Sequence, residues 1–147
     1  MRTLSTIVLT ASLAAVCLGQ NAGPAHGSGQ GVQALVQDAK TRVTEMKVDQ
    51  LKSAQASGEK LTLIDVREDN EWEAGHAAGA MHLSRGLIEF SIESKVPEKN
   101  TKIVLYCGSG ARSALAADSI MKMGYTNVVS LAGGMGAYKA AGLPTEK

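Results

Sequence analysis

The chain of 147 residues has few aromatic side chains, which make up 3% of it, and it has only two cysteines. With so few aromatic rings, a folded core has to be built mostly from aliphatic side chains and methionine. Two cysteines exclude a disulfide-rich fold. A chain of this length can bury a sufficient core without disulfides or a structural metal.

The chain also has no large excess of charge of either sign, because it contains 15 Lys and Arg and 14 Asp and Glu. The absence of a basic stripe argues against a nucleic-acid partner, and the absence of an acidic tail argues against a chaperone. The three histidines are dispersed, so we expect no metal site. Gly108-Ser109-Gly110 lacks the rest of a phosphate-binding or dinucleotide-binding fingerprint, and we expect no cofactor.

The first 25 residues have the three parts of a secretory signal peptide. Arg2 gives a positive start, an apolar run extends from Leu4 to Leu18, and small residues follow. The run is too short and too interrupted for a membrane span. We therefore expect an exported, periplasmic protein with no integral span after cleavage. Lipid attachment at Cys17 is an alternative, but Val16 stands where such sites carry a small residue.

The rest of the chain reads as one α/β domain after a short extension. Residues 26–31 form a Gly-rich linker, and apolar residues spaced by three and four predict a helix over Val32–Met46. In residues 47–147 short apolar runs alternate with helical patterns, which predicts a central parallel sheet with helices on both faces. The predicted strands are 61–66, 80–83, 103–106 and 128–131. The predicted helices are 51–57 with Asp49 as its cap, 70–74, 85–94 with Ser84 as its cap, 113–123 and 135–141.

Cys107 stands directly after the clearest strand, 103–106, and just before a helix. Ligands of such sheets bind at the carboxyl ends of strands. The glycines allow the loop to curl with its N–H groups inward, and amides at a helix N-terminus hold anions and favour a thiolate. Arg112 has a planar fork that binds two oxygens of a sulfonate or phosphate. We predict Cys107 and Arg112 as catalytic, and as substrate-binding residues Gly108, Ser109, Gly110, Ala111 and Ser113.

A nucleophilic sulfur inside an anion cradle suits a donor such as thiosulfate, in which a sulfane sulfur is attached to an anionic leaving group. Attack by Cys107 would release sulfite and leave a persulfide, which the cradle would stabilise. A thiol or cyanide would take the sulfur in a second step. The competing interpretation is a buried core thiol with no chemistry, and the glycines around Cys107 argue against it.

The residues from about 47 to 147 resemble the rhodanese family in its single-domain form. Any one of the matching motifs is weak, but four in the right order are specific. They are Leu63-Ile64-Asp65-Val66-Arg67-Glu68, Glu71-Trp72 with Gly75-His76 and Gly79-Ala80, the loop Cys107 to Arg112, and Gly133-Gly134 with Gly142-Leu143-Pro144.

The resemblance implies a persulfide on Cys107, a loop that binds the substrate anion, and Arg112 helping to hold it. It also implies that Asp65 and Arg67 lie near this loop, as substrate-binding residues. A purely structural ion pair at the strand end is an equal alternative for those two residues.

Other positions of the resemblance are less informative. His76 follows a helix-ending glycine and is expected to be structural rather than a general base. His82 and Arg85 lie in a segment that could border the pocket, and their roles stay open. Ala78 stands where the family often has Pro, and Tyr138 where it often has Trp. Both look like packing positions.

Three rival functions remain. Phosphatases and arsenate reductases also use a Cys, a loop of amides and an Arg, but usually with five residues between Cys and Arg, whereas this loop has four. A persulfide carrier or binding module would load sulfur without turnover. A redox thiol protein would need a resolving cysteine, and only Cys17 is available. The sequence does not indicate the oligomeric state.

Overall fold

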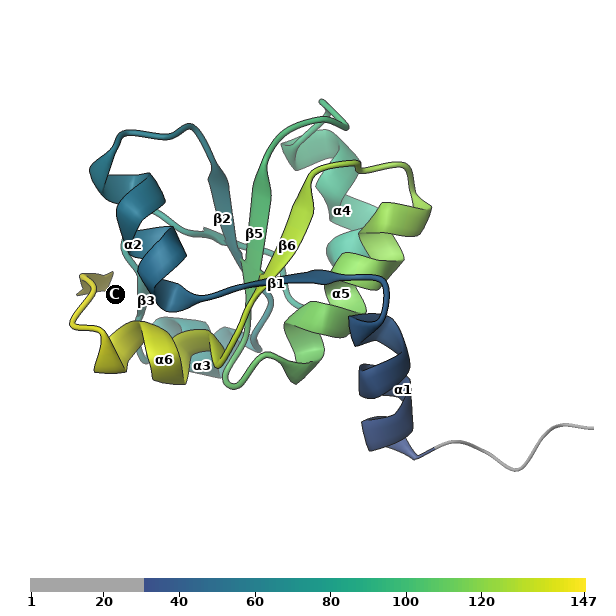
Figure 1. Cartoon of the computed structure of the whole chain (residues 1–147), viewed down its shortest axis with the longest axis horizontal. Helices are drawn as coiled ribbons and strands as arrows, with labels where there is room; N and C mark the ends of the chain where they lie inside the picture. Colours follow the sequence, from purple (N-terminus) through teal and green to yellow (C-terminus); the bar gives the residue numbers. More distant parts are fainter. Residues whose placement is uncertain (1–30) are drawn as a thin grey trace, which may run out of the picture.

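A computed structural model describes residues 31–147, so the predicted signal peptide, Cys17 and the linker before Gly31 lie outside the described residues. Figure 1 shows a sheet between two groups of helices. In chain order the elements are α1 (Val32–Lys40), β1 (Thr44–Met46), α2 (Val48–Ala56), β2 (Thr62–Asp65), α3 (Asp69–Glu73), β3 (His76–Ala77), β4 (Met81–His82), α4 (Ile88–Lys95), β5 (Ile103–Tyr106), α5 (Ala111–Lys122), β6 (Val128–Leu131), α6 (Gly134–Ala140) and β7 (Thr145–Glu146).

The main sheet has five strands in the order β1-β6-β5-β2-β4, and every neighbouring pair is parallel. The helices α4 and α5 contribute to the core on one face, and α2 and α6 to the core on the other. The predicted α/β fold, with a parallel sheet covered by helices on both faces, is confirmed. No helix within residues 31–147 has the length and apolar character needed to cross a membrane.

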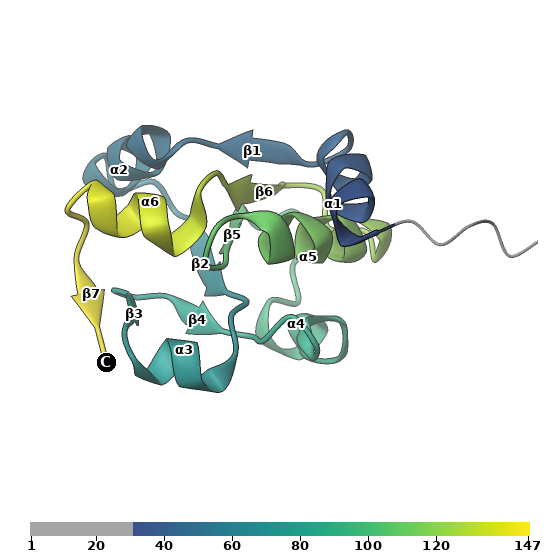
Figure 2. The same ribbon diagram turned by 90° about the horizontal axis from the view of Figure 1, so that it is seen from below.

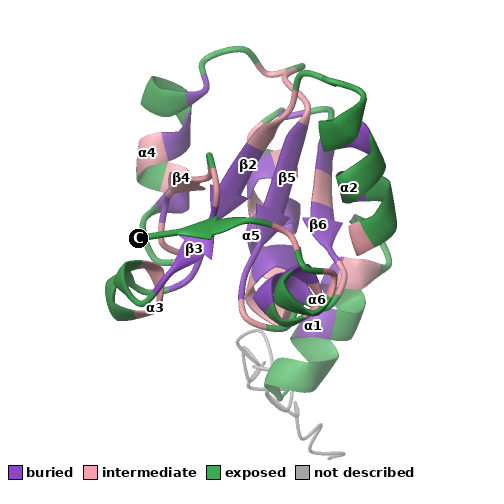
Figure 3. Ribbon diagram, turned by 90° about the vertical axis from the view of Figure 1, so that its left-hand side faces the viewer, coloured by how far each residue is buried: buried purple, intermediate pink, exposed green. Residues whose placement is uncertain are grey.

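Strand β5 shows why the sequence folds this way. Ile103 and Leu105 belong to the core on the α4 and α5 side, and Val104 and Tyr106 to the core on the α2 and α6 side. All four are fully buried, and Figure 3 shows the central strands buried between helices with exposed outer faces. A strand covered on both faces reads as a continuous apolar run rather than an alternating one. The run ends at Cys107, which is therefore placed at the carboxyl edge of the sheet.

The predicted helix over Val32–Met46 is too long. Helix α1 ends at Lys40, and β1 pairs in parallel with β6, Thr44 lying opposite Val129. Pairing with β6 satisfies the backbone groups on one side of β1, and Val43, just before this strand, is buried in the core. The helical spacing of apolar residues continues past the end of α1 because Val43, in the turn after the helix, also faces the core.

Two predicted helix starts are also wrong. Helix α4 begins at Ile88 rather than Arg85, because the chain first makes a turn in which the Leu87 N–H donates to the Ser84 carbonyl. Asp49 lies in the first turn of α2 rather than capping it, since the helix starts at Val48. The antiparallel pair of β3 and β7 was not predicted, because strands of two residues leave no periodic pattern.

Arg42 joins α1 to α5. Its guanidinium donates to Asp118 on α5 at 2.7 Å and to Asp38 on α1 at 2.7 Å, and Lys122 also donates to Asp118 at 2.7 Å. Figure 2 shows α1 lying beside α5. The hydrogen bond from Arg42 lowers the pKa of Asp118 to about 2.

We expect Asp118→Asn to lower the free energy of unfolding by about 1 kcal/mol at pH 7, a modest effect because Arg42 is partly solvated. The folded-state pKa of Asp118 lies below its unfolded value of about 3.9, so the contribution is complete at neutral pH and is lost as the pH falls through 2. Urea unfolding of both proteins across this range measures it. Glu98→Gln, an exposed carboxylate without a side-chain partner among the described residues, is the control. A difference that is independent of pH would contradict the assignment.

Candidate active site

The sulfur of Cys107 lies inside the loop that joins β5 to α5, and the residue is only 1% exposed. The backbone N–H of Gly110 donates to the sulfur at 3.1 Å, and the hydroxyl of Ser113 donates to it at 3.7 Å. Gly110 has a φ of 103° and is the N-cap residue directly before α5. This left-handed conformation, which glycine adopts without strain, turns the loop back over the sulfur.

Two opposing effects set the pKa of the Cys107 thiol. Burial raises the pKa, because it disfavours the charged form. Hydrogen bonds from the N–H and hydroxyl of Ser113, and from the N–H groups of Gly110 and Ser109, lower it. The hydrogen bonds prevail, and the pKa lies below the ordinary value of a thiol. The site therefore favours a thiolate, which is the nucleophilic form of cysteine.

The carbonyl groups of the same loop are held by the start of α6. The N–H of Met135 donates to the Cys107 carbonyl at 2.7 Å, and the N–H of Gly136 donates to the Gly108 carbonyl at 3.2 Å. Figure 2 shows the β5–α5 loop beside α6. Because the Gly108 carbonyl bonds to α6, the N–H of the same peptide group, which is that of Ser109, points away from α6, and this N–H is one of the donors that lower the pKa of the Cys107 thiol.

Ser113 is itself fixed by a second buried hydroxyl. Its Oγ lies 2.8 Å from the Oγ of Ser130 on β6 and 3.2 Å from the carbonyl oxygen of Gly110, and both serines are fully buried. A Ser130 proton directed at Ser113 leaves the single Ser113 proton to be shared between the sulfur and the Gly110 carbonyl oxygen. Sequence reasoning missed Ser130, although a serine inside the buried run Val128–Leu131 was a signal.

Arg112 does not present a free guanidinium. Its two terminal nitrogens donate to the two carboxylate oxygens of Glu71 on α3, at 2.6 and 2.8 Å. The hydrogen bond to Arg112 lowers the pKa of Glu71, and the pKa of Arg112 is raised in turn. Sequence reasoning assigned this fork to a substrate anion and did not give Glu71 a role at the site.

Asp65 and Arg67 form a buried ion pair with each other. The Arg67 guanidinium donates to the Asp65 carboxylate at 2.6 to 3.0 Å and to the Gly75 carbonyl at 2.9 Å. Within the described residues, no hydrogen bond joins either side chain to residues 107–113. The pair lies next to the loop all the same, since the Arg67 guanidinium is 5.8 Å from the ring of Tyr106. It connects the end of β2 to the far end of α3.

The histidines pack around Trp72. The rings of His76 and His82 both stack on its indole, with centroid distances of 3.3 and 4.9 Å. His76 Nδ1 lies 3.2 Å from the Trp72 carbonyl oxygen, and His82 Nε2 lies 2.9 Å from the Arg67 carbonyl oxygen. Both side chains thus brace the segment that carries Glu71.

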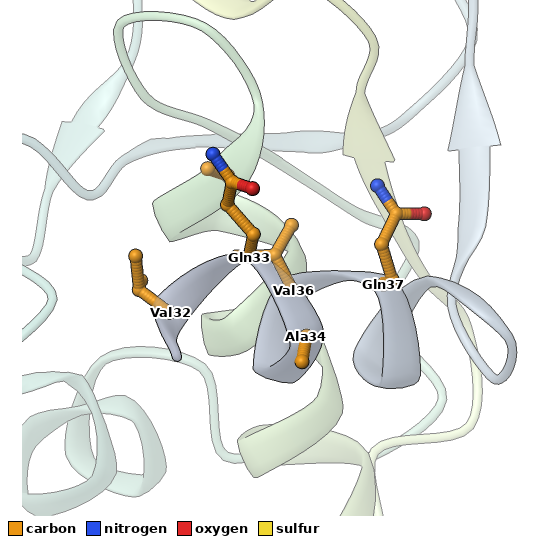
Figure 4. Close-up of a pocket in the computed structure, with 6 residues that line it drawn as sticks. Val32, Gln33, Ala34, Val36 and Gln37 are labelled. Atoms are coloured by element: carbon orange, nitrogen blue, oxygen red, sulfur yellow. The ribbon is translucent and has the colours of Figure 1, made fainter. Parts of the chain in front are cut away.

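Arg85 and Ala111 both lie outside the shell of donors around the sulfur. Arg85 pairs with Glu89 at 2.8 Å and donates to the Ser119 hydroxyl. Ala111, at the start of α5, borders an open pocket of about 490 Å³ whose other wall is α1 (Figure 4). The α1 residues that line it are Val32, Gln33, Ala34, Val36 and Gln37. Among residues 31–147, no three His, Cys, Asp or Glu side chains are placed to hold a metal ion together.

Comparison with known proteins decides the family. The profile of the rhodanese-like domain matches residues 47–141, which include the whole loop around Cys107. The chain belongs to the rhodanese-like family. The resemblance to the rhodanese family is thereby confirmed, and α1 and β1 lie before the matched region.

Relatives of this rhodanese-like chain include a sulfurtransferase of Allochromatium vinosum, 36% identical over 69% of this chain and 94% of the relative. The probable adenylyltransferase/sulfurtransferase MoeZ of Mycobacterium tuberculosis is 42% identical over 56% of this chain, but this is only 21% of MoeZ. A solved Rhodopseudomonas palustris structure superposes with a TM-score of 0.73 at 30% identity, covering 84% of this chain and 100% of the other. That protein is described as being of unknown function and a possible tyrosine phosphatase.

Two glycines of α6 test how the rhodanese-like loop is held. Gly134 has a φ of 52°, and a Cβ there would collide with the Cys107 carbonyl, whereas a Cβ on Gly136 would meet only an ordinary contact at 3.7 Å. We expect Gly134→Ala to cost about 3 kcal/mol of unfolding free energy, from the left-handed backbone and the collision together. Gly136→Ala should change stability little. Urea unfolding measures both, and equal effects of the two substitutions would refute this account of the loop.

Proposed function

We propose that this chain is a sulfurtransferase that carries sulfane sulfur as a persulfide on Cys107. The observation that carries the proposal is the loop itself, in which amides and a hydroxyl converge on one buried sulfur. The names of relatives such as the Allochromatium vinosum sulfurtransferase support it. The similar Rhodopseudomonas palustris structure is described as a possible tyrosine phosphatase, so the reaction has to be tested on this chain itself.

The proposed first step is attack of the Cys107 thiolate on the sulfane sulfur of thiosulfate. The new bond joins the two sulfurs, the S–S bond of thiosulfate breaks, and its electron pair leaves with sulfite. The persulfide that remains carries one negative charge, as the thiolate did, so the same N–H and hydroxyl donors can stabilise it.

In the second step cyanide or a thiol attacks the outer sulfur of the persulfide. With cyanide the products are thiocyanate and the Cys107 thiolate, so the enzyme returns to its starting state. We assign Gly108, Ser109, Gly110, Ala111 and Ser113 to the donor site as the loop around the sulfur. Arg112 acts there through its pair with Glu71. The ion pair of Asp65 and Arg67 supports the loop from the end of β2 and does not contact the donor.

We propose further that the reaction takes place in the periplasm. The support is the sequence of residues 1–25, with its positive start and apolar run. Attachment through a lipid on Cys17 is the alternative to release as a free protein.

A phosphatase is the second candidate, because the solved Rhodopseudomonas palustris relative is described as a possible tyrosine phosphatase. Two features of this chain argue for sulfur instead. The loop has four residues between Cys107 and Arg112, which leaves less room for a tetrahedral oxyanion. The Arg112 fork, which would hold a phosphoryl group, is occupied by Glu71.

Incubation with thiosulfate in the absence of an acceptor tests the proposal. We expect the intact mass of the wild-type protein to rise by one sulfur atom, and that of Cys107→Ser to stay unchanged. Cyanide should then remove the sulfur as thiocyanate. A carrier would load sulfur but turn over slowly with small acceptors. Hydrolysis of an aryl phosphate that depends on Cys107, with no sulfur gained from thiosulfate or from a persulfide donor, would overturn the proposal in favour of a phosphatase.

A further inference from the structure

Glu71 binds the guanidinium of Arg112, the group that the sequence predicts to bind the substrate anion. Both of its carboxylate oxygens accept from the terminal nitrogens of Arg112, at 2.6 and 2.8 Å, which is a bidentate pair. The pair lies at the loop, since a Cβ on Gly108 would be 3.5 Å from an Arg112 nitrogen and 3.9 Å from a Glu71 oxygen. A donor that reaches the loop therefore meets a guanidinium whose fork is already filled.

A second carboxylate strengthens this effect. Glu68 Oε1 lies 3.8 Å from the same Arg112 nitrogen that binds Glu71. The Arg112 charge is thus balanced by Glu71, and Glu68 adds further negative charge around it. Bidentate pairs of this kind are strong and directional, and each unit charge acts over several ångströms in a partly solvated site.

We propose that Glu71 is a specificity-determining residue, which keeps the Arg112 fork from donor anions and so favours donors of low charge, such as small alkyl persulfides, over dianionic thiosulfate. The inference rests on the sulfurtransferase function proposed above, and it names the class of donor. Thiosulfate remains a donor in this scheme, but a weak one.

The reaction with a persulfide donor is balanced. The Cys107 thiolate attacks the outer sulfur of R–S–SH, the bond between the two donor sulfurs breaks, and the electron pair leaves with the thiolate R–S⁻. The proton stays on the outer sulfur, so Cys107 becomes a hydropersulfide. The neutral donor brings no charge to the site, and the single charge of the Cys107 thiolate leaves on R–S⁻. Thiosulfate brings two charges, so three are present in that step, of which two leave with sulfite and one stays on the persulfide.

A simpler role for Glu71 is to support α3. Its carboxylate also accepts a long hydrogen bond of 3.3 Å from the Glu68 N–H at the start of that helix. Loss of such support would loosen the loop and slow sulfur loading from every donor alike. Loss of charge would change loading from charged donors only. The ratio of two donors therefore separates the two roles.

The experiment compares wild type with Glu71→Gln, which removes the charge and keeps the size. Sulfur loading of Cys107 is followed by intact mass at low concentrations of thiosulfate or of the persulfide of 2-mercaptoethanol, whose electrophilic form R–S–SH is uncharged. We expect the second-order rate constant for thiosulfate to rise about tenfold, as removal of one charge near a dianion predicts. The constant for the persulfide should change less than about twofold.

Glu73→Gln is the matched control, because Glu73 is an exposed carboxylate on the same helix and has no side-chain partner among the described residues. It should change neither constant. If Glu71→Gln folds poorly by thermal melting, Glu68→Gln removes the more distant charge and should shift the donor ratio in the same direction by less.

Equal changes for both donors, or no change for either, would overturn the inference while leaving the sulfurtransferase function intact. Failure of the wild-type protein to take sulfur from either donor would overturn the proposed function, and the inference with it.

Discussion

The direction of four peptide groups, those of the loop after Cys107, is the constraint on which this structure depends. The carbonyls of Cys107 and Gly108 bond to the first turn of α6, which leaves the N–H of Ser109, in the second of these peptide groups, as a donor to the sulfur, and the N–H of Gly110 also donates to it. A loop that lost its contacts with α6 could turn these groups over and present carbonyl oxygens to the sulfur. A thiolate would then be repelled rather than stabilised. Gly134 is needed because only a residue without a side chain lets the two backbones approach so closely.

A chain of polar contacts fixes the other side of the site. Asp65 at the end of β2 binds Arg67, and Arg67 reaches the Gly75 carbonyl beyond α3. The segment between them carries Glu71, which in turn holds Arg112 at the start of α5. The ion pair at the strand end is therefore part of the site without touching the sulfur. Its effect passes through the position of α3 to the arginine beside the loop.

Much of this could be predicted from the sequence. Strands 103–106 and 128–131 were found at their true bounds, because short apolar runs between glycines and polar residues specify buried parallel strands. The loop followed from its glycines. The partner of Arg112 could not be predicted, because Glu71 lies 41 residues earlier in the chain. Nothing in the local sequence marks which carboxylate folds against the arginine. Likewise the local spacing predicts helix across β1. Its strand conformation depends on pairing with β6, which lies far along the chain.

Backbone and hydroxyl donors lower the pKa of the Cys107 thiol despite its burial, and the chemistry proposed for the site depends on this effect. The most direct test is the pH dependence of iodoacetamide alkylation, followed at the peptide that contains Cys107, in wild type and in Ser113→Ala. The account predicts a midpoint below that of an ordinary thiol in wild type, because hydrogen bonds outweigh burial, and a higher midpoint when the Ser113 hydroxyl is removed. A wild-type midpoint equal to that of the same peptide in the unfolded chain would contradict it.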